Sequence, residues 1–130
     1  MRHIGLFGGS FNPVHSGHLL AAEAVAKTLR LDEVRFIPAA QSPLKQRPDL
    51  PDHHRVKMLQ QALKPYTAFV LDKRELERPG PSYTIDTLRD IQAQQPGDHL
   101  YLLLGLDAWT QFDLWCDWQR IPNYCHLVVM

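Results

Sequence analysis

Apolar segments of strand length alternate with helix-forming segments along the whole chain, and this alternation limits the fold more than any other feature. The predicted strands are residues 2–7, 33–38, 68–71, 100–104 and 126–130. The predicted helices are residues 16–30, a segment with Asp52 as its N-cap that runs to Leu63, residues 84–94, and a helical stretch over 107–120. The last two strands are apolar on both faces, which is typical of a parallel sheet covered by helices on both sides. The pattern predicts an α/β fold with a Rossmann-like, doubly wound parallel sheet in three layers.

A length of 130 residues predicts a single domain over residues 1–130. Because the chain stops on an apolar strand, we expect a C-terminally truncated fold, the N-terminal portion of a longer domain. No apolar run reaches the roughly 18–20 residues that span a bilayer, and the N-terminus lacks a secretory pattern, so we expect a cytoplasmic protein without a membrane partner. Cys116 and Cys125 are too few for a disulfide scaffold and are expected to be ordinary buried thiols.

Charge and composition narrow the function classes. An apolar fraction of 45% argues against intrinsic disorder. Fourteen Lys and Arg residues balance fourteen Asp and Glu residues, so the formal net charge is zero. A protein that binds nucleic acid by neutralising phosphates usually has a basic excess, so we expect no nucleic-acid partner. A small anionic ligand remains possible because it needs only a few placed cations.

The run GGSFNPVHSGH, residues 8–18, joins the first strand to the first helix. Its glycines allow the backbone to approach a ligand closely, and a helix start is a natural phosphate site. His15 and His18 fall on one face of the helix opening, with Gly17 between them leaving the ligand unshielded. Two structural histidines are one alternative. A zinc pair is another, but no Cys, Asp or Glu in the loop completes a ligand set.

The position of a site follows from the predicted sheet. In such sheets ligands bind beyond the carboxyl ends of the strands, where the strand order reverses. Two strands lead through Gly-containing turns into helices, at Gly8-Gly9 and at Gly105. The spacing matches neither the dinucleotide fingerprint nor the P-loop, so a different phosphate loop is predicted there.

The loop resembles the signature of the nucleotidylyltransferase superfamily, whose His-x-Gly-His motif binds the phosphates of ATP. Further segments are similar to the bacterial type of the nicotinate mononucleotide adenylyltransferase family. They are Ile37-Pro38-Ala39 with its Pro/Lys loop, RVKML from Arg55 to Leu59, Glu75-Leu76, PSYTIDTL over residues 81–88, and Gly105-Leu106-Asp107 with Trp115. The resemblance implies adenylyl transfer from ATP to nicotinate mononucleotide, which yields nicotinate adenine dinucleotide and pyrophosphate in NAD biosynthesis. It also implies in-line attack without a covalent intermediate, Mg²⁺ carried with ATP, and no tightly bound organic cofactor.

The resemblance also implies roles for individual residues. The catalytic residues would be His18, which donates to the reacting α-phosphate, and His15, which holds neighbouring phosphate oxygens. The ATP-binding residues would be Gly9, Ser10, Phe11, His15, His18, Gly105 and Asp107. The residues for nicotinate mononucleotide would be Lys45, Tyr83, Thr84 and Trp115. No protein ligand to a metal is implied.

Other interpretations stay open for Lys45, its neighbour Arg47 and Asp107. Lys45 and Arg47 could be solvated residues of a proline-rich surface loop, and Asp107 could be a helix N-cap. Trp109 and Trp118 are expected to pack in the core.

The sequence departs from the family pattern at three places. Leu44 stands where many members carry a histidine, and Asn12 replaces the commoner aspartate. Members also continue to an Ile-Ser-Ser-Thr-x-x-Arg segment that binds the β- and γ-phosphates. The 130 residues alone are therefore expected to be weakly active or inactive. Two alternatives are a phosphopantetheine adenylyltransferase-like enzyme and a non-catalytic nucleotide-binding module. The sequence does not predict the oligomeric state.

Overall fold

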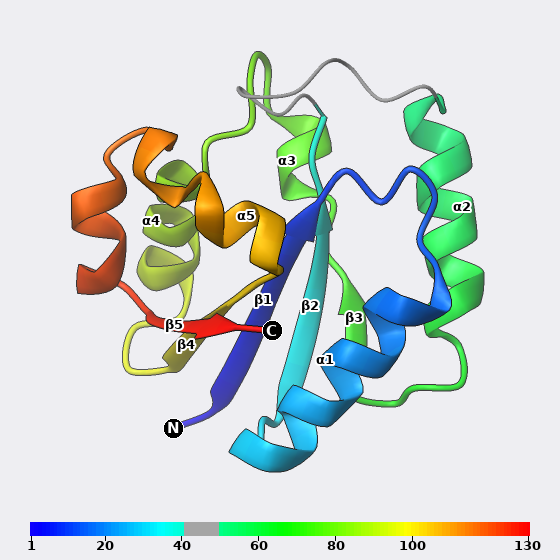
Figure 1. The fold of residues 1–130 in the computed structure, drawn as a ribbon, viewed down its shortest axis with the longest axis horizontal. Coiled ribbons are helices and arrows are strands. Elements are labelled where there is room, and N and C mark those ends of the chain that lie inside the picture. The colour runs from blue at the N-terminus through cyan, green and yellow to red at the C-terminus, as the bar shows by residue number, and fades with distance from the viewer. Residues whose placement is uncertain (41–49) are drawn as a thin grey trace.

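Five parallel strands form one sheet in the computed structural model, which describes residues 1–40 and 50–130 (Figure 1). The strands are β1 His3–Gly9, β2 Glu33–Pro38, β3 Phe69–Leu71, β4 His99–Leu104 and β5 His126–Val129. Their order is β3-β2-β1-β4-β5, and all neighbours pair in parallel. The chain winds outward from β1 to β3 and then returns to the other side of β1 with β4. The predicted doubly wound parallel sheet is confirmed, and its switch point lies between β1 and β4.

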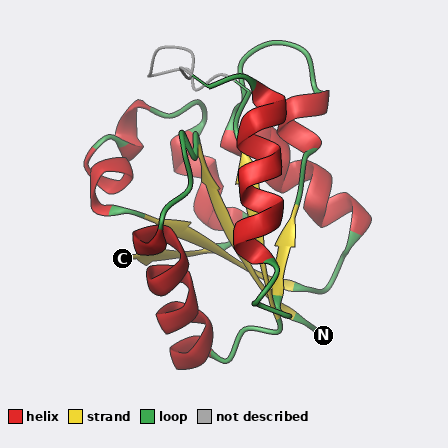
Figure 2. Cartoon of the chain, turned by 90° about the vertical axis from the view of Figure 1, so that its right-hand side faces the viewer, coloured by secondary structure: helices red, strands yellow, loops and turns green. Residues whose placement is uncertain are grey.

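Helices cover both faces of the twisted sheet (Figure 2). They are α1 Ser16–Leu29, α2 Asp52–Leu63, α3 Arg74–Glu77, α4 Thr84–Gln94 and α5 Leu106–Thr110, followed by the 3₁₀ helices η1 Phe112–Leu114 and η2 Trp118–Asn123. No helix in the described part of the chain has the length and apolar character to cross a membrane.

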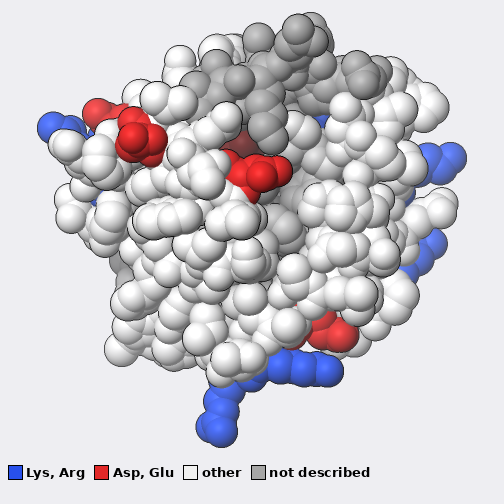
Figure 3. Space-filling view, in the orientation of Figure 1, with Lys and Arg blue, Asp and Glu red and all other residues white. Residues whose placement is uncertain are grey.

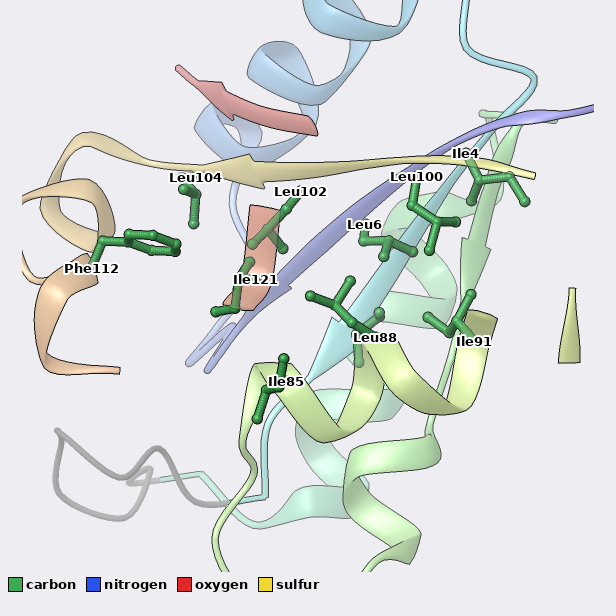
Figure 4. Packing of buried hydrophobic residues seen from close by; sticks show 11 residues of the cluster. Ile4, Leu6, Ile85, Leu88, Ile91, Leu100, Leu102, Leu104, Phe112 and Ile121 are labelled. Atoms are coloured by element: carbon green, nitrogen blue, oxygen red, sulfur yellow. The ribbon is translucent and has the colours of Figure 1, made fainter. Parts of the chain in front are cut away.

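The face of the sheet covered by α4 is aliphatic. Ile85, Leu88 and Ile91 recur every three residues along α4 and point toward the sheet (Figure 4). They pack with Ile4 and Leu6 of β1 in one buried cluster. On the opposite face, toward α1 and α2, a second buried cluster is rich in phenylalanine. The alternation of β1 divides its side chains between the two clusters.

Residues 107–120 do not form the single helical stretch that the sequence predicts. The chain forms α5, η1 and η2 instead, with a left-handed backbone at Asp117 (φ 52°). Its aromatic residues Trp109, Phe112, Trp115 and Trp118 are spaced by three. This spacing suits the three-residue turn of a 3₁₀ helix better than a continuous α-helix. The rings of Trp115 and Trp118 lie 5.3 and 6.1 Å from the ring of Phe112, which is buried.

Two further differences concern helix starts. The prediction of Asp52 as an N-cap was wrong, because Pro51 holds that position and Asp52 is the first residue of α2. Its carboxylate accepts instead from Arg55 one turn later, at 2.7 Å. Helix α3 was not predicted, because four residues are too short for a periodic pattern.

Candidate functional site

A pocket of about 180 Å³ lies at the carboxyl ends of β1 and β4, at the switch point of the sheet. Its residues are Gly8, Gly9, Ser10, Ala39, Glu75, Ser82, Tyr83, Thr84, Leu102, Leu103, Leu104, Gly105, Ala108, Gln111, Trp115 and Cys116. Both Gly-containing turns that the sequence singled out therefore line it. A cavity at this place is where an open α/β sheet binds its ligand.

One wall of the pocket is the start of α4. Tyr83 is the N-cap of this helix of 11 residues, and Thr84 is its first residue. The first N–H groups of a helix have no partner within it, and the helix dipole is positive at this end. Ser82 is held just before them, because its hydroxyl accepts from the backbone N–H of Ala40 at 3.2 Å. This wall favours an anionic group such as a carboxylate.

The opposite wall carries an aromatic ring. Trp115 follows η1 and is partly buried against Phe112. The remaining surface of its indole lines the pocket, so a flat ring could stack there.

The side chains of His15 and His18 both accept hydrogen bonds from backbone N–H groups at the start of α1. The Nδ1 atom of His15 accepts from the N–H of Gly17, and the Nδ1 atom of His18 accepts from the N–H of His15, both at 3.1 Å. A neutral imidazole that accepts through Nδ1 carries its proton on Nε2. The local backbone therefore fixes both imidazoles as Nε2–H donors. Preorganised donors of this kind can stabilise charge on a phosphate oxygen.

The rings of His15 and His18 are stacked, with centroids 3.7 Å apart and planes inclined by 22°. The ring of His18 also meets Phe7 and Phe11 edge-on. Burial, and then repulsion from His15, lowers the pKa of His18 below the usual 6.5. His18 is thus held neutral, the state that keeps the donor and acceptor roles of its two nitrogens distinct.

This lowered pKa predicts a pH dependence of stability. The unfolded chain binds a proton at His18 more readily than the folded chain, so the free energy of unfolding should fall as pH drops below 6.5. The contribution of neutral His18 to the free energy of unfolding is fully present above pH 6.5. It is lost as the pH falls through the pKa of His18 in the folded protein. Denaturant unfolding between pH 5 and 8 measures it, and His18→Gln should flatten the curve. An unchanged slope in that variant would contradict the assignment.

Gly17 has a steric role within the loop. A Cβ atom at Gly17 would lie 2.9 Å from both Cε1 and Nδ1 of His15. The glycine therefore makes room for the imidazole that caps its own N–H.

Replacing Gly17 by alanine should displace the His15 ring. Alanine improves helix propensity by up to about 1 kcal/mol, and loss of the cap costs a similar amount, so stability should change by less than about 1 kcal/mol. The imidazole of His15 and its Nε2–H group should nevertheless move, and any reaction that uses this donor should slow by about tenfold or more. Thermal unfolding and turnover measured on the same sample test this separation. A loss of stability with normal turnover would contradict it.

The structure brings six of the predicted site residues to the pocket: Gly9, Ser10, Gly105, Tyr83, Thr84 and Trp115. His15 and His18 do not line it and stand at the start of α1, which follows the pocket-lining end of β1.

Phe11 and Asp107 also lie outside the pocket. Phe11 is 3% exposed, and its ring packs in the core against Phe7 and Phe36. Asp107 is exposed as the second residue of α5, and Gly105 is the N-cap, so the N-cap interpretation of Asp107 was wrong.

The remaining residues named from the sequence lie in the segment after β2 or are tryptophans other than Trp115. Lys45, Arg47 and Leu44 lie outside the described residues. Trp118 packs against the buried cluster, as expected. Trp109 stacks on Phe112 but remains 43% exposed, so it is only partly a packing residue.

Glu75 lines the pocket and has no role in the sequence-based prediction. It is 7% exposed, and the hydroxyl of Thr87 donates to it at 2.6 Å. Arg78 donates to the same hydroxyl at 2.7 Å. Burial raises the pKa of Glu75, and the hydrogen bond from Thr87 opposes that rise. The hydrogen bond between Glu75 and Thr87 joins α3 to the first turn of α4, so it stabilises the pocket wall that the start of α4 forms. In the sequence, similarity to the family at Glu75-Leu76 is the one signal for this residue.

The two cysteines differ from each other. Cys125 is partly buried, and burial raises its pKa to about 12. Cys116 is exposed and lines the pocket beside Trp115, so the expectation of a buried thiol was wrong there. The reason is that residues 115–117 form an extended turn between η1 and η2 rather than a helix face.

Figure 3 shows Lys and Arg side chains mainly along the margins of this face and an acidic group near its centre. Among residues 1–40 and 50–130, no three or more His, Cys, Asp or Glu side chains are grouped so as to hold a metal ion. The described part of the site therefore offers a ligand backbone groups, imidazoles, aromatic surface and the carboxylate of Glu75.

Comparison with known proteins gives one family. The cytidylyltransferase-like family model matches residues 6–130. The chain is 42% identical over 131 residues to a probable nicotinate-nucleotide adenylyltransferase of Pseudomonas putida (strain GB-1), covering 100% of this chain and 60% of the relative. It is 43% identical over 128 residues to a protein of the same description from Methylibium petroleiphilum, covering 98% and 60%. The chain thus spans about 60% of the length of these curated relatives.

Solved structures share the fold. A putative nicotinate-nucleotide adenylyltransferase from Vibrio parahaemolyticus aligns with a TM-score of 0.83 at 21% identity, covering 99% of this chain and 73% of that one. A nicotinic acid mononucleotide adenylyltransferase from Plasmodium falciparum, complexed with NaAD, aligns with a TM-score of 0.85 at 18% identity, covering 99% and 64%. At these identities the likeness concerns the fold alone.

Proposed function

The chain belongs to the cytidylyltransferase-like family, and from this premise we propose that it serves adenylyl transfer from ATP to nicotinate mononucleotide. The products are nicotinate adenine dinucleotide and pyrophosphate, within NAD biosynthesis. One observation carries the proposal: a single pocket joins an anion-favouring helix start and an indole to the loop that leads to two preorganised imidazole donors. The description of the curated relatives supports the same reaction.

The acceptor is proposed to occupy the pocket between α4 and Trp115. The pyridine ring stacks on the indole, and its carboxylate accepts from the backbone N–H of Thr84, with Tyr83 beside it. Lys45 is proposed to contribute to the acceptor's phosphate. The amide form of the acceptor would carry no negative charge at this position, so the helix start would distinguish the two forms.

The donor nucleotide is proposed to bind along the Gly-rich loop. Gly9, Ser10, Phe11 and Gly105 supply backbone surface, and Asp107 accepts from the ribose hydroxyls. Mg²⁺ arrives with ATP as part of that substrate, held mainly by phosphate and water oxygens. A cytoplasmic location, the absence of a nucleic-acid or membrane partner, and the absence of a tightly bound organic cofactor remain predictions from the sequence.

The chemistry is a single displacement. An oxygen of the acceptor's phosphate attacks the α-phosphorus in line, and the bond from that phosphorus to the α–β bridging oxygen breaks. Pyrophosphate leaves with the bonding electrons. The Nε2–H group of His18 donates to the α-phosphate, and that of His15 donates to neighbouring phosphate oxygens. This step needs positioned reactants and charge stabilisation rather than a side-chain nucleophile.

Calorimetric titration with nicotinate mononucleotide tests the acceptor assignment, with nicotinamide mononucleotide as the comparison. The acid form should bind about tenfold tighter, because its carboxylate receives a charge-assisted hydrogen bond at the helix start. Trp115→Ala should weaken binding by about tenfold through the lost stacking.

Trp109→Ala is the matched control, because Trp109 does not line the pocket, and it should leave affinity unchanged. Equal affinities for acid and amide, or equal effects of the two tryptophan variants, would contradict the proposal. Circular dichroism establishes that each variant is folded.

A further inference from the structure

Arg55 is a buried cation that the proposed mechanism does not use. Its side chain, on α2, is 0% exposed, although arginine is almost never fully buried unless it is paired. Its Nη2 group donates to the carboxylate of Asp52 at 2.7 Å, a pair within one helix turn. Its Nη1 group donates to the backbone carbonyl of Ser10 at 2.6 Å, across 45 residues of sequence. The guanidinium therefore joins α2 to the loop that lines the pocket.

The segment that Arg55 holds has a strained backbone. Phe11 has φ 43°, the left-handed region that residues other than glycine rarely adopt. Such a conformation persists only where its surroundings enforce it. The buried Phe11 ring fixes one side of the loop, and the hydrogen bond from Arg55 to Ser10 fixes the other.

The same hydrogen bond sets the direction of a peptide group. The carbonyl of Ser10 points at α2, and the N–H of the same planar peptide, which belongs to Phe11, points the opposite way. The guanidinium also stays positive at every physiological pH. Asp52, its ion-pair partner, has a side chain that is 45% exposed, so water screens it more than it screens the buried cation. The direction of the Phe11 N–H and the positive charge of Arg55 both favour the binding of an anion at residues 9–11.

We propose that Arg55 is a positioning residue for the triphosphate of ATP: it acts through the Ser10 carbonyl and holds residues 9–11 in their binding conformation. This inference rests on the proposed function. It predicts different effects for substitutions at Arg55 and at Asp52, because both residues take part in the ion pair but Arg55 also contacts Ser10 of the loop.

Calorimetric titration of the purified protein with Mg²⁺ and the α,β-methylene analogue of ATP tests the inference without any need for turnover. Arg55→Met, similar in length but without donors, should raise the Kd for the analogue about tenfold or more. Arg55→Lys, which keeps the charge and one donor, should have an intermediate Kd. In both variants the Kd for nicotinate mononucleotide should stay within about twofold.

Asp52→Asn is the matched control, because it removes the same ion pair but leaves the contact with Ser10. It should lower the Tm and leave the Kd for the analogue unchanged. If folded Arg55→Lys and Arg55→Met bind the analogue as the wild type does, Arg55 is only structural and the inference is overturned. If the wild type binds no ATP analogue, the proposed function fails and the inference falls with it.

Discussion

Replacing His18 by alanine should lower the rate of adenylyl transfer by about 10²–10³-fold, which is the usual cost of losing one preorganised donor at a developing charge. The Nδ1 atom of His18 is occupied by the N–H of His15, so Nε2–H is the donor that the variant lacks. The KM values for both nucleotides should change by less than about threefold, because the lost interaction strengthens in the transition state. Steady-state kinetics with both substrates varied measure this split.

His53→Ala is the control for this prediction. His53 is exposed on α2, and its ring lies tilted beside that of its neighbour His54, so its loss should leave the rate unchanged. A rate for His18→Ala within threefold of the wild type, in a protein of normal Tm, would remove His18 from the mechanism. A large rise in KM without a change in kcat would make His18 a ground-state binding residue instead.

Phe36→Ala should destabilise the protein by about 3–5 kcal/mol, a large part of a typical domain's stability. Phe36 lies on β2 at 0% exposure, and its ring is 5.2–5.6 Å from those of Phe7, Phe11 and Phe69. The variant loses the transfer free energy of the ring and leaves a cavity beside Phe11 of the loop between β1 and α1. Denaturant unfolding gives the difference in the free energy of unfolding.

Val70→Ala on β3 is the corresponding control, because Val70 is 39% exposed and should cost less than about 1 kcal/mol. A cost below 1 kcal/mol for Phe36→Ala would contradict the description of this phenylalanine-rich cluster as tightly packed.

The regular elements were largely predictable because each has a local signal. Residues 84–94 form α4 with the predicted bounds, since their apolar residues recur at helical spacing after a turn. The first strand is longer than predicted and runs to Gly9, because Gly8 and Gly9 pair with Ile37 and Pro38 of β2. Glycine has a low strand propensity, so only the neighbouring strand reveals this extension.

The supporting residues of the site were not predictable in the same way. Arg55 reads as a polar residue of a helix, and its burial depends on a carbonyl 45 residues away. Glu75 lies in a four-residue helix, and its partner Thr87 is 12 residues away. Each polar side chain is buried with a hydrogen bond to a group distant in the sequence, the Ser10 carbonyl for Arg55 and the Thr87 hydroxyl for Glu75, and no local pattern encodes that contact. The family resemblance did imply Gly9, Ser10, Gly105, Tyr83, Thr84 and Trp115, and all six line the pocket.

The most direct test of the proposed reaction is a single-turnover experiment with the purified protein in excess over the acceptor, so that even slow transfer is detected. Mg²⁺ and ATP are supplied with nicotinate mononucleotide, nicotinamide mononucleotide or phosphopantetheine, and phosphorus NMR follows the products. The proposed function predicts nicotinate adenine dinucleotide and pyrophosphate in equal amounts, faster than transfer to the amide and without transfer to phosphopantetheine. Adenylylated phosphopantetheine, or transfer to the amide at least as fast as transfer to the acid, would contradict it.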